Sequence, residues 1–273
     1  MCTNTARFSS HPSSAYSLKS RVEKLEKRLS GGKADGEEYA VINGGEPTLH
    51  PRFLEFTAWL RKRLKGAPLT LLSNGRRFRD EKFARKFSKI AKRPFSAAVP
   101  LHSSDPDLHD GITGIKNSFA ETEKGLENLF AFFGGEIEIR IVLHGLNASS
   151  LPATLAWLRR RFGRYPRWHV TVIHFEIEGK AKKNLKKLSL TLSAAARLLG
   201  KAAGELKKLG KPRLYHYPLC VLPVELRKYS IISLPETMRV YPAKCSGCRM
   251  KKNCPGLMKS YYAVYGEKEL KPF

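Results

Sequence analysis

Two glycines and a carboxylate near the start of the chain could bind a ligand. The apolar residues at 39–43 predict a buried strand, and the apolar spacing that follows predicts a helix over 51–64. Gly44, Gly45 and Glu46 therefore stand where a strand ends and a helix begins. Glycines let a backbone turn sharply and approach a ligand closely, and the C-terminal edge of a strand is where α/β folds bind ligands. A tight turn with a solvated glutamate is the alternative.

The cysteines are a second group of residues with chemical potential. They are Cys2, Cys220, Cys245, Cys248 and Cys254. The last three form a C-x2-C-x5-C pattern, and a C-x2-C turn presents two thiolates to one metal. An odd number of cysteines crowded toward one end does not fit a secreted disulfide framework. We therefore expect a metal site, and the spacing leaves zinc and an iron–sulfur cluster as equal alternatives.

Basic residues surround this pattern, and we expect them to favour thiolates over thiols and to offset the charge of a cluster. They are Lys244, Arg249, Lys251 and Lys252.

The whole chain is strongly basic, with 50 lysines and arginines against 24 acidic residues and a formal net charge of +26. This charge suits a nucleic acid, an acidic peptide or a nucleotide as partner. The basic residues are spread over predicted helix faces without interleaved stacking aromatics, so general surface basicity is favoured over a nucleic-acid groove. No apolar run is long enough to span a membrane and no signal peptide is visible, so we expect a cytoplasmic protein without membrane contact.

Alternating strands and helices must position these residues. Strands are predicted at 39–43, 69–73, 96–101, 136–143 and 168–175, and helices at 18–29, 51–64, 80–91, 117–133, 150–162 and 189–209. Repeated strand–helix units imply an α/β fold with a parallel sheet. We expect one domain over 1–210 and a small cysteine-rich extension over 211–273, with mobile segments at 3–16 and 30–36.

The string GGEPTLHP at 44–51 resembles the second-strand motif of radical S-adenosylmethionine (radical SAM) enzymes. Three later features fit the same family: Ser-Asn-Gly at 73–75, Pro-Leu-Cys at 218–220, and the C-x2-C-x5-C pattern. Together they resemble the His-Xaa-Ser system radical SAM maturase group over about residues 39–273. The resemblance implies a partial (β/α) TIM-like barrel, followed by a SPASM or twitch extension that carries an auxiliary [4Fe-4S] cluster on Cys220, Cys245, Cys248 and Cys254.

The resemblance also implies where SAM binds, with the Gly-Gly-Glu edge holding its amino group. The implied cofactor-binding residues are Gly44, Gly45, Glu46, Ser73, Asn74 and Arg140. Ser73 and Asn74 could instead form an ordinary strand-ending turn. Arg140 lies on a strand that is expected to be covered on both faces, so it needs a carboxylate partner, for which SAM is one candidate.

Several other polar residues are expected to be packed rather than chemical. They are His102, His109 and His144, expected as packed or surface histidines, and Tyr261, Tyr262 and Tyr265, expected in the core or at an interface of the C-terminal part.

The family's radical cluster is a [4Fe-4S] cluster held by CxxxCxxC, and only Cys2 stands at the corresponding place. One thiolate cannot hold a cluster that needs three. Two expectations follow: the recorded start falls inside the motif, which we favour, or the chain is a degenerate member.

The main prediction is a radical SAM enzyme that cleaves SAM to a 5′-deoxyadenosyl radical. The radical would abstract hydrogen from a peptide or protein substrate, with an electron donor as a further partner. The alternative is a metal-binding scaffold, with Fe–S or Zn, that binds an acidic partner or nucleic acid.

Overall fold

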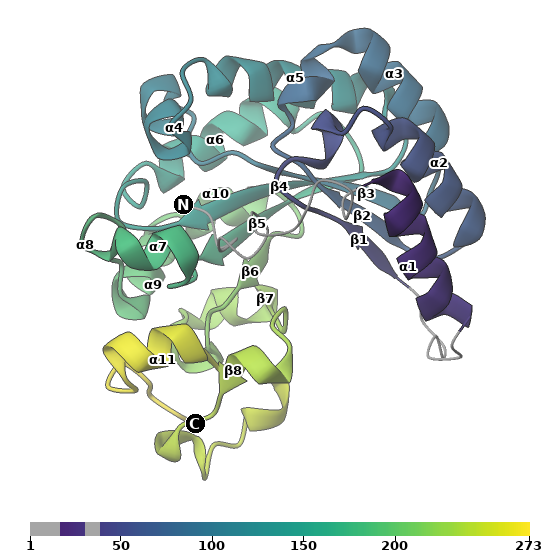
Figure 1. Cartoon of the computed structure of the whole chain (residues 1–273). Helices are drawn as coiled ribbons and strands as arrows, with labels where there is room; N and C mark the ends of the chain where they lie inside the picture. The colour runs from purple at the N-terminus through teal and green to yellow at the C-terminus, as the bar shows by residue number, and fades with distance from the viewer. Residues whose placement is uncertain (1–16, 31–38) are drawn as a thin grey trace. The chain divides into compact units, whose positions relative to one another are not determined.

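The computed structural model describes residues 17–30 and 39–273 (Figure 1). Cys2 and nearly all of the segments predicted to be mobile lie outside the described residues; only Ser30 is described, at the end of helix α1 (Leu18–Ser30). In the part of the chain that is described, no helix combines the length and the apolar character needed to cross a membrane.

Seven strands form one sheet, and they follow one another in it as they do in the sequence. They are β1 (Ala40–Ile42), β2 (Leu69–Leu72), β3 (Phe95–Pro100), β4 (Glu136–Leu143), β5 (Trp168–His174), β6 (Arg213–Tyr215) and β7 (Ser230–Ile231). The pairs β1–β2, β2–β3, β5–β6 and β6–β7 are parallel. A sequential parallel order is that of a (β/α) barrel, whereas a doubly wound sheet reverses its strand order. The predicted α/β fold, a partial TIM-like barrel, is confirmed.

The helices connect these strands. They are α2 (Phe53–Arg63), α3 (Glu81–Ile90), α4 (Pro106–Thr113), α5 (Ser118–Phe132), α6 (Leu151–Phe162), α7 (Gly179–Lys183), α8 (Leu185–Leu188), α9 (Leu192–Lys201), α10 (Ala203–Lys208) and α11 (Lys259–Tyr265). The short 3-10 helices η3 (Pro47–Leu49) and η4 (Arg76–Arg79) follow β1 and β2. Strands β8 (Arg239–Val240) and β9 (Leu257–Met258) form a separate antiparallel pair.

Two helical predictions need correction. The helix predicted over 189–209 is two helices, because α9 ends at Lys201 and α10 begins at Ala203; Gly200 and Gly204 flank the break, and glycine weakens a continuous helix. Helix α4 lies between the strand predicted at 96–101 and the helix predicted at 117–133, where no helix was predicted. Its N-cap is Asp105, whose carboxylate accepts hydrogen bonds from the backbone N–H groups of Asp107 and Leu108.

The described chain divides into two compact units. The first unit comprises the described residues up to Pro100 together with Ser118–Glu138, and the second comprises Leu101–Asn117 and Ile139–Phe273. Strands β6 and β7, although they lie beyond residue 211, belong to the seven-stranded sheet.

An aromatic cluster fills the core of the first unit. The ring of Phe87 on α3 lies 5.0 Å from that of Phe78, 5.5 Å from Phe95 and 5.3 Å from Phe133, between ring centroids. Phe87 and Phe78 are fully buried. The rings join helices α3 and α5 to strand β3, and Figure 1 shows α2, α3 and α5 beside β1–β3. Burial of such rings is the main stabilising term for this unit.

The core of the second unit is aliphatic. Leu143 at the end of β4, Leu155 and Leu158 on α6, Val172 on β5 and Leu199 on α9 have no exposed surface. These residues pack helices against the parallel strands, so that the carboxyl ends of the strands keep a fixed geometry.

Helix α5 approaches the turn after β2 at a single glycine. A Cβ atom at Gly125 would lie 2.1 Å from the carbonyl oxygen of Gly75. Gly75 has φ of 79°, a left-handed conformation, and a Cβ there would lie 2.6 Å from Cγ1 of Val99. Both positions require glycine, and both support the turn that contains Ser73 and Asn74.

We predict that Gly125→Ala destabilises the protein by about 1–3 kcal/mol, because the added methyl forces α5 away from Gly75. Gly111→Ala, in helix α4, is the matched control, since a Cβ there meets nothing within 4 Å. Thermal unfolding measures both. The control is expected to be neutral or stabilised by up to about 1 kcal/mol, and an unchanged melting temperature for Gly125→Ala would contradict the close approach.

Candidate functional site

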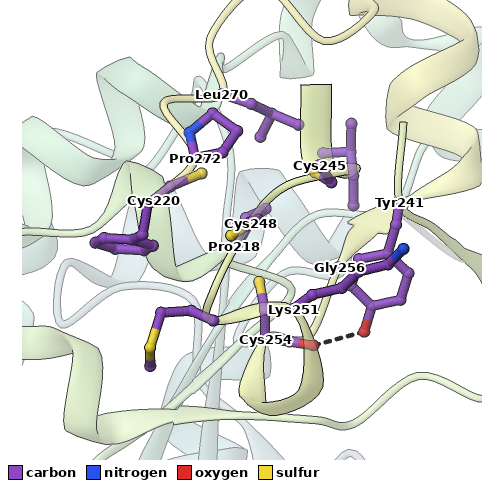
Figure 2. Close-up of a pocket in the computed structure, with 13 residues that line it drawn as sticks. Pro218, Cys220, Tyr241, Cys245, Cys248, Lys251, Cys254, Gly256, Leu270 and Pro272 are labelled. Atoms are coloured by element: carbon purple, nitrogen blue, oxygen red, sulfur yellow. Dashed lines mark hydrogen bonds between the residues drawn. The ribbon is translucent and has the colours of Figure 1, made fainter. Parts of the chain in front are cut away.

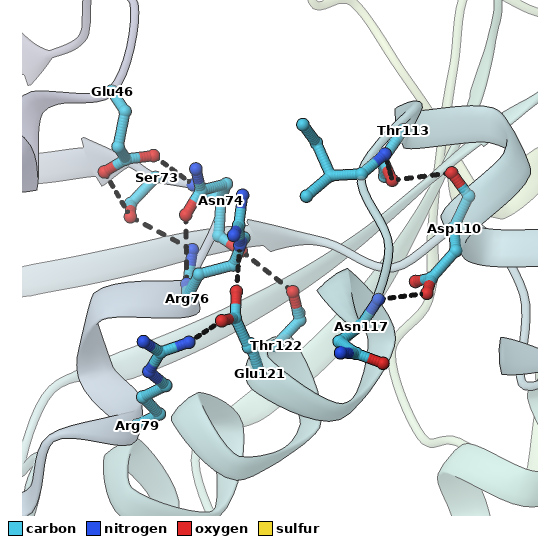
Figure 3. A network of polar contacts seen from close by, with 12 residues as sticks. Glu46, Ser73, Asn74, Arg76, Arg79, Asp110, Thr113, Asn117, Glu121 and Thr122 are labelled. Atoms are coloured by element: carbon cyan, nitrogen blue, oxygen red, sulfur yellow. Dashed lines mark hydrogen bonds and ion pairs between the residues drawn. The ribbon is translucent and has the colours of Figure 1, made fainter.

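Glu46 joins the ends of β1 and β2 through four hydrogen bonds (Figure 3). Its Oε1 accepts from the backbone N–H of Thr48 at 3.1 Å, from Oγ1 of Thr48 at 2.6 Å and from Oγ of Ser73 at 2.8 Å. Its Oε2 accepts from the backbone N–H of Asn74 at 2.6 Å. Ser73 and Asn74 lie 27 and 28 residues further along the chain. The structure therefore brings the Gly-Gly-Glu and Ser-Asn-Gly segments together.

The two glycines before Glu46 are exposed, and the fold does not require glycine there. A Cβ at Gly44 or Gly45 would meet nothing within 4 Å. Neither residue has the left-handed backbone that favours glycine. Gly75 is different, because both its positive φ and its close packing require a glycine at that position. The turn thus presents backbone at the carboxyl end of a parallel strand, the edge where α/β folds bind ligands.

Further side-chain contacts hold the turns after β1 and β2 in place. Arg77 donates from Nη1 to the carbonyl oxygen of Thr48 at 2.7 Å, and Thr122 on α5 donates from Oγ1 to the carbonyl oxygen of Asn74 at 3.2 Å. The Glu121 carboxylate on α5 pairs with Arg76 and Arg79. The second strand-end turn is therefore tied to the helix that packs on it. Thr48 and Thr122 had no predicted role, because a lone threonine gives no signal in the sequence.

Arg140, the sixth predicted SAM-binding residue, lies on β4 in the second unit. It is half-buried. Its charge, together with the larger effect of burial, lowers the pKa of His216 to about 4. The structure thus brings together Gly44, Gly45 and Glu46 with Ser73 and Asn74 in one unit, and it places Arg140 in the other.

Three histidines cluster at the carboxyl ends of β3 and β4 in the second unit. The ring of His102 lies 5.7 Å from that of His109 and 6.4 Å from that of His144, between centroids. The Nδ1 atoms of His109 and His144 accept backbone N–H groups, so each neutral ring carries its proton on Nε2. Asn147, which had no predicted role, donates from Nδ2 to the carbonyl oxygens of His102 and Val142. These histidines are packed and buried.

The tyrosines of the C-terminal part differ from one another. Tyr261 is buried, and its hydroxyl accepts from the backbone N–H of Leu192 at 2.9 Å and donates to Glu269. The hydroxyl of Tyr265 lies 2.7 Å from Oγ of Ser189. Tyr262 is 39% exposed and so does not lie in the core, which was one of the two positions predicted for it.

Four cysteines line one pocket in the second unit, as Figure 2 shows. Cys245 and Cys248 come from the turn after η8 (Ala243–Cys245), Cys254 follows η9 (Lys251–Asn253), and Cys220 lies in η5 (Leu219–Val221). Apolar residues complete the wall of the pocket: Pro218, Leu257, Leu270, Pro272 and Phe273. The backbone N–H of Leu219 points at Sγ of Cys254 at 3.5 Å. The cysteines predicted as one ligand set therefore share one space.

The prediction that basic neighbours favour thiolates is wrong for two of these cysteines. Burial raises the pKa of Cys220 and of Cys245, and the other cysteines raise both further. Nζ of Lys244 donates to the carbonyl oxygen of Lys268 at 3.3 Å, whereas Lys251 lines the pocket with its Nζ 5.7 Å from the ring centroid of Tyr241. A bound metal would change this, because metal coordination deprotonates thiols outright.

Four cysteine thiols are chemically suitable ligands for a metal site, but they are not arranged around a single ion. Among the described residues, no group of three or more histidine, cysteine, aspartate or glutamate side chains is arranged to hold a single metal ion. A tetrahedral zinc would require four sulfurs at about 2.3 Å from one point. Figure 2 shows the four sulfurs spread around the pocket instead.

The buried histidines predict a loss of stability in acid. Burial lowers the pKa of His102 to about 3 and the pKa values of His109, His144, His174 and His216 to about 4. Unfolded histidine has a pKa near 6.5, so between pH 6.5 and 4 only the unfolded chain gains these protons. Stability is therefore complete above pH 6.5 and falls as the pH drops, by up to about 1.4 kcal/mol per pH unit for each histidine.

Urea unfolding at pH 7 and pH 5 measures this effect. The midpoint is expected to be clearly lower at pH 5, and His144→Gln should reduce the pH dependence because glutamine does not titrate. Equal midpoints at the two pH values would show that these rings are not buried in the neutral form.

Comparisons with known proteins agree with this geometry. The model of the radical SAM superfamily matches residues 2–158. GTP 3′,8-cyclase from Actinobacillus succinogenes is 30% identical over 152 residues, which are 55% of this chain and 44% of that protein. GTP 3′,8-cyclase from Edwardsiella ictaluri is 32% identical over 127 residues, 46% of this chain and 37% of that protein. The chain thus spans less than half the length of these curated relatives.

A solved radical SAM methyltransferase from Sphaerobacter thermophilus has a TM-score of 0.47 and 17% identity, over 72% of this chain and 56% of that chain. The family match covers more than half of the chain, including the strand ends that Glu46 joins. The chain belongs to the radical SAM superfamily.

Proposed function

We propose that this chain binds S-adenosylmethionine on the turn that Glu46 and its hydrogen bonds form at the ends of β1 and β2. The observation that carries the proposal is the pair Gly44–Gly45, which neither backbone conformation nor packing requires to be glycine. A side chain is unnecessary for the fold there, but it would keep a ligand away from the backbone. The turn also lies within the segment that the family model matches.

The methionine part of SAM carries an ammonium group, and this turn offers it acceptors. Backbone carbonyl groups each have two lone pairs, so they can accept from a ligand in addition to an existing partner. Ser73 and Asn74 lie beside the turn and complete a polar edge.

We further propose that Cys220, Cys245, Cys248 and Cys254 hold an auxiliary [4Fe-4S] cluster of the SPASM or twitch kind. Their shared pocket supports a common ligand, and the resemblance to the SPASM or twitch extension favours a cluster over one zinc ion. Such a cluster supplies electron transfer when bound. The radical chemistry of the family also needs a CxxxCxxC ligand set, of which the sequence holds only Cys2, so the reaction below requires two further cysteines.

The proposed reaction is hydrogen abstraction from a peptide or protein by the 5′-deoxyadenosyl radical, with an external electron donor. The resemblance of the cysteine-rich part to peptide-modifying enzymes supports a peptide substrate. GTP is the competing substrate class, because the relatives are GTP 3′,8-cyclases. Equilibrium binding of GTP by the purified protein separates the two, and tight GTP binding would overturn the peptide proposal.

We predict that anaerobic loading with iron and sulfide gives about four iron and four sulfide atoms per chain at the C-terminal cysteines. Cys254→Ser should lose most of this iron, because it removes one of four ligands. Ser246→Ala is the matched control, since it changes the same loop without removing a thiol, and it should load normally. Iron and acid-labile sulfide analysis measures the outcome. A single zinc ion without sulfide would instead support the metal-binding scaffold.

We also predict that Gly45→Val weakens SAM binding by at least about tenfold, or about 1.4 kcal/mol, while the melting temperature stays unchanged. The valine meets no protein atom from its Cβ but blocks the exposed backbone. Gly134→Val is the control, since Gly134 is also exposed with open space around it. Isothermal titration with SAM provides the affinities. Unchanged affinity in Gly45→Val would remove the turn from the SAM site.

A further inference from the structure

Helices α7 and α8 of the second unit carry a dense group of exposed lysines, which we call the lysine surface. It consists of Lys180, Lys182, Lys183, Lys186 and Lys187, all of them exposed. No acidic residue interrupts the run from 180 to 187. Within the described part of the chain, none of these five ammonium groups has an ion-pair partner.

Several other basic helices carry acidic partners for their charges. On α5, Lys124 pairs with Glu127 at 3.1 Å. On α10, Glu205 pairs with both Arg159 and Lys208. Like charges that no nearby acid neutralises repel one another and attract an anionic partner. The lysine surface is therefore suited to bind a chain of negative charges.

Packing fixes the lysine surface at the carboxyl ends of β4 and β5. Helix α7 follows β5 along the chain, and Ala181 and Leu188 anchor α7 and α8 because both are buried. Gly145, just after the end of β4, donates its backbone N–H to the carbonyl oxygen of Leu188 at 3.0 Å. Oγ of Ser189 lies 2.7 Å from the hydroxyl of Tyr265. Ligands of (β/α) barrels bind at this edge of the sheet.

We infer that the lysine surface docks an acidic segment of the peptide or protein substrate beside the carboxyl edge of the barrel. The inference rests on the peptide substrate of the proposed function and adds the chemistry that recognises it. Aspartate and glutamate side chains supply the complementary charge. Leu146, which follows Gly145, is 43% exposed and offers a peptide an apolar contact. Residues 179–188 contain no aromatic side chain on which bases could stack, so an acidic peptide is favoured over RNA.

Charge reversal tests the docking surface. The variant combines Lys182→Glu, Lys183→Glu and Lys186→Glu, and the probe is a fluorescein-labelled oligoglutamate peptide whose affinity is measured by fluorescence anisotropy. We expect binding to weaken by at least about tenfold, because each lost exposed ion pair contributes about twofold and the new carboxylates repel the probe. Binding to the wild-type chain should also weaken as the salt concentration rises.

The matched control combines Lys82→Glu, Lys86→Glu and Lys89→Glu on α3. These lysines are also exposed, and the change in net charge is the same. They lie in the other unit, so we expect oligoglutamate affinity to change by less than about twofold. Glutamine versions of both variants remove the charges without adding repulsion and should keep the same order. Thermal unfolding verifies that all four variants fold.

The inference is overturned if the wild-type chain does not bind oligoglutamate, if the α7–α8 variant keeps its affinity, or if the α3 variant loses as much. Equal losses would show general surface basicity instead. It is also overturned if a labelled oligouridine RNA binds more tightly than oligoglutamate and loses affinity only in the α7–α8 variant.

Titration with SAM separates this inference from the proposed function. Both charge-reversal variants should bind SAM as the wild-type chain does, because neither changes the Gly44–Gly45 turn. Failure of the wild-type chain to bind SAM would refute the proposed SAM site, and tight GTP binding would refute the peptide substrate. Failure of charge reversal to weaken oligoglutamate binding would refute the docking surface alone.

Discussion

The hydrogen bonds of the Glu46 carboxylate are the constraint on which the candidate site depends. β1 is a strand of three residues at one end of the sheet order, so little else fixes the turn that follows it. Oxygens of Glu46 accept donors from that turn and from the end of β2. Charge-assisted hydrogen bonds of this kind are shorter and stronger than neutral ones. Two segments that are distant in sequence thereby become one polar edge at the carboxyl ends of adjacent parallel strands.

The packing around this edge explains why it can be rigid. Gly75 and Gly125 let helix α5 lie directly against the second turn, and Thr122 and Glu121 on that helix bind its backbone and its arginines. The phenylalanine cluster centred on Phe87 anchors α3 and α5 beneath it. In contrast, a Cβ added at Gly44 or Gly45 would meet no protein atom within 4 Å. A rigid support below an open backbone is the arrangement that ligand binding needs, since preorganised groups lose little entropy on binding.

The sequence predicted the elements of the fold better than the contacts of the site. Apolar runs located β1 to β5 within one or two residues because buried parallel strands are almost continuously apolar. Helix α4 was missed because its signal is one capping aspartate and a proline, without apolar periodicity. The role of Thr48 and the ring tautomers of His109 and His144 depend on partners brought close by folding. The thiol prediction failed because burial raises the pKa of Cys220 and of Cys245.

The central claim is that SAM binds at the Gly44–Gly45 turn, which the hydrogen bonds of Glu46 connect to the end of β2. A crystal structure of the protein with SAM tests it most directly. We expect the ammonium nitrogen at about 3 Å from backbone carbonyl oxygens of this turn, with Thr48, Ser73 and Asn74 still bound to Glu46. SAM bound elsewhere would contradict the account.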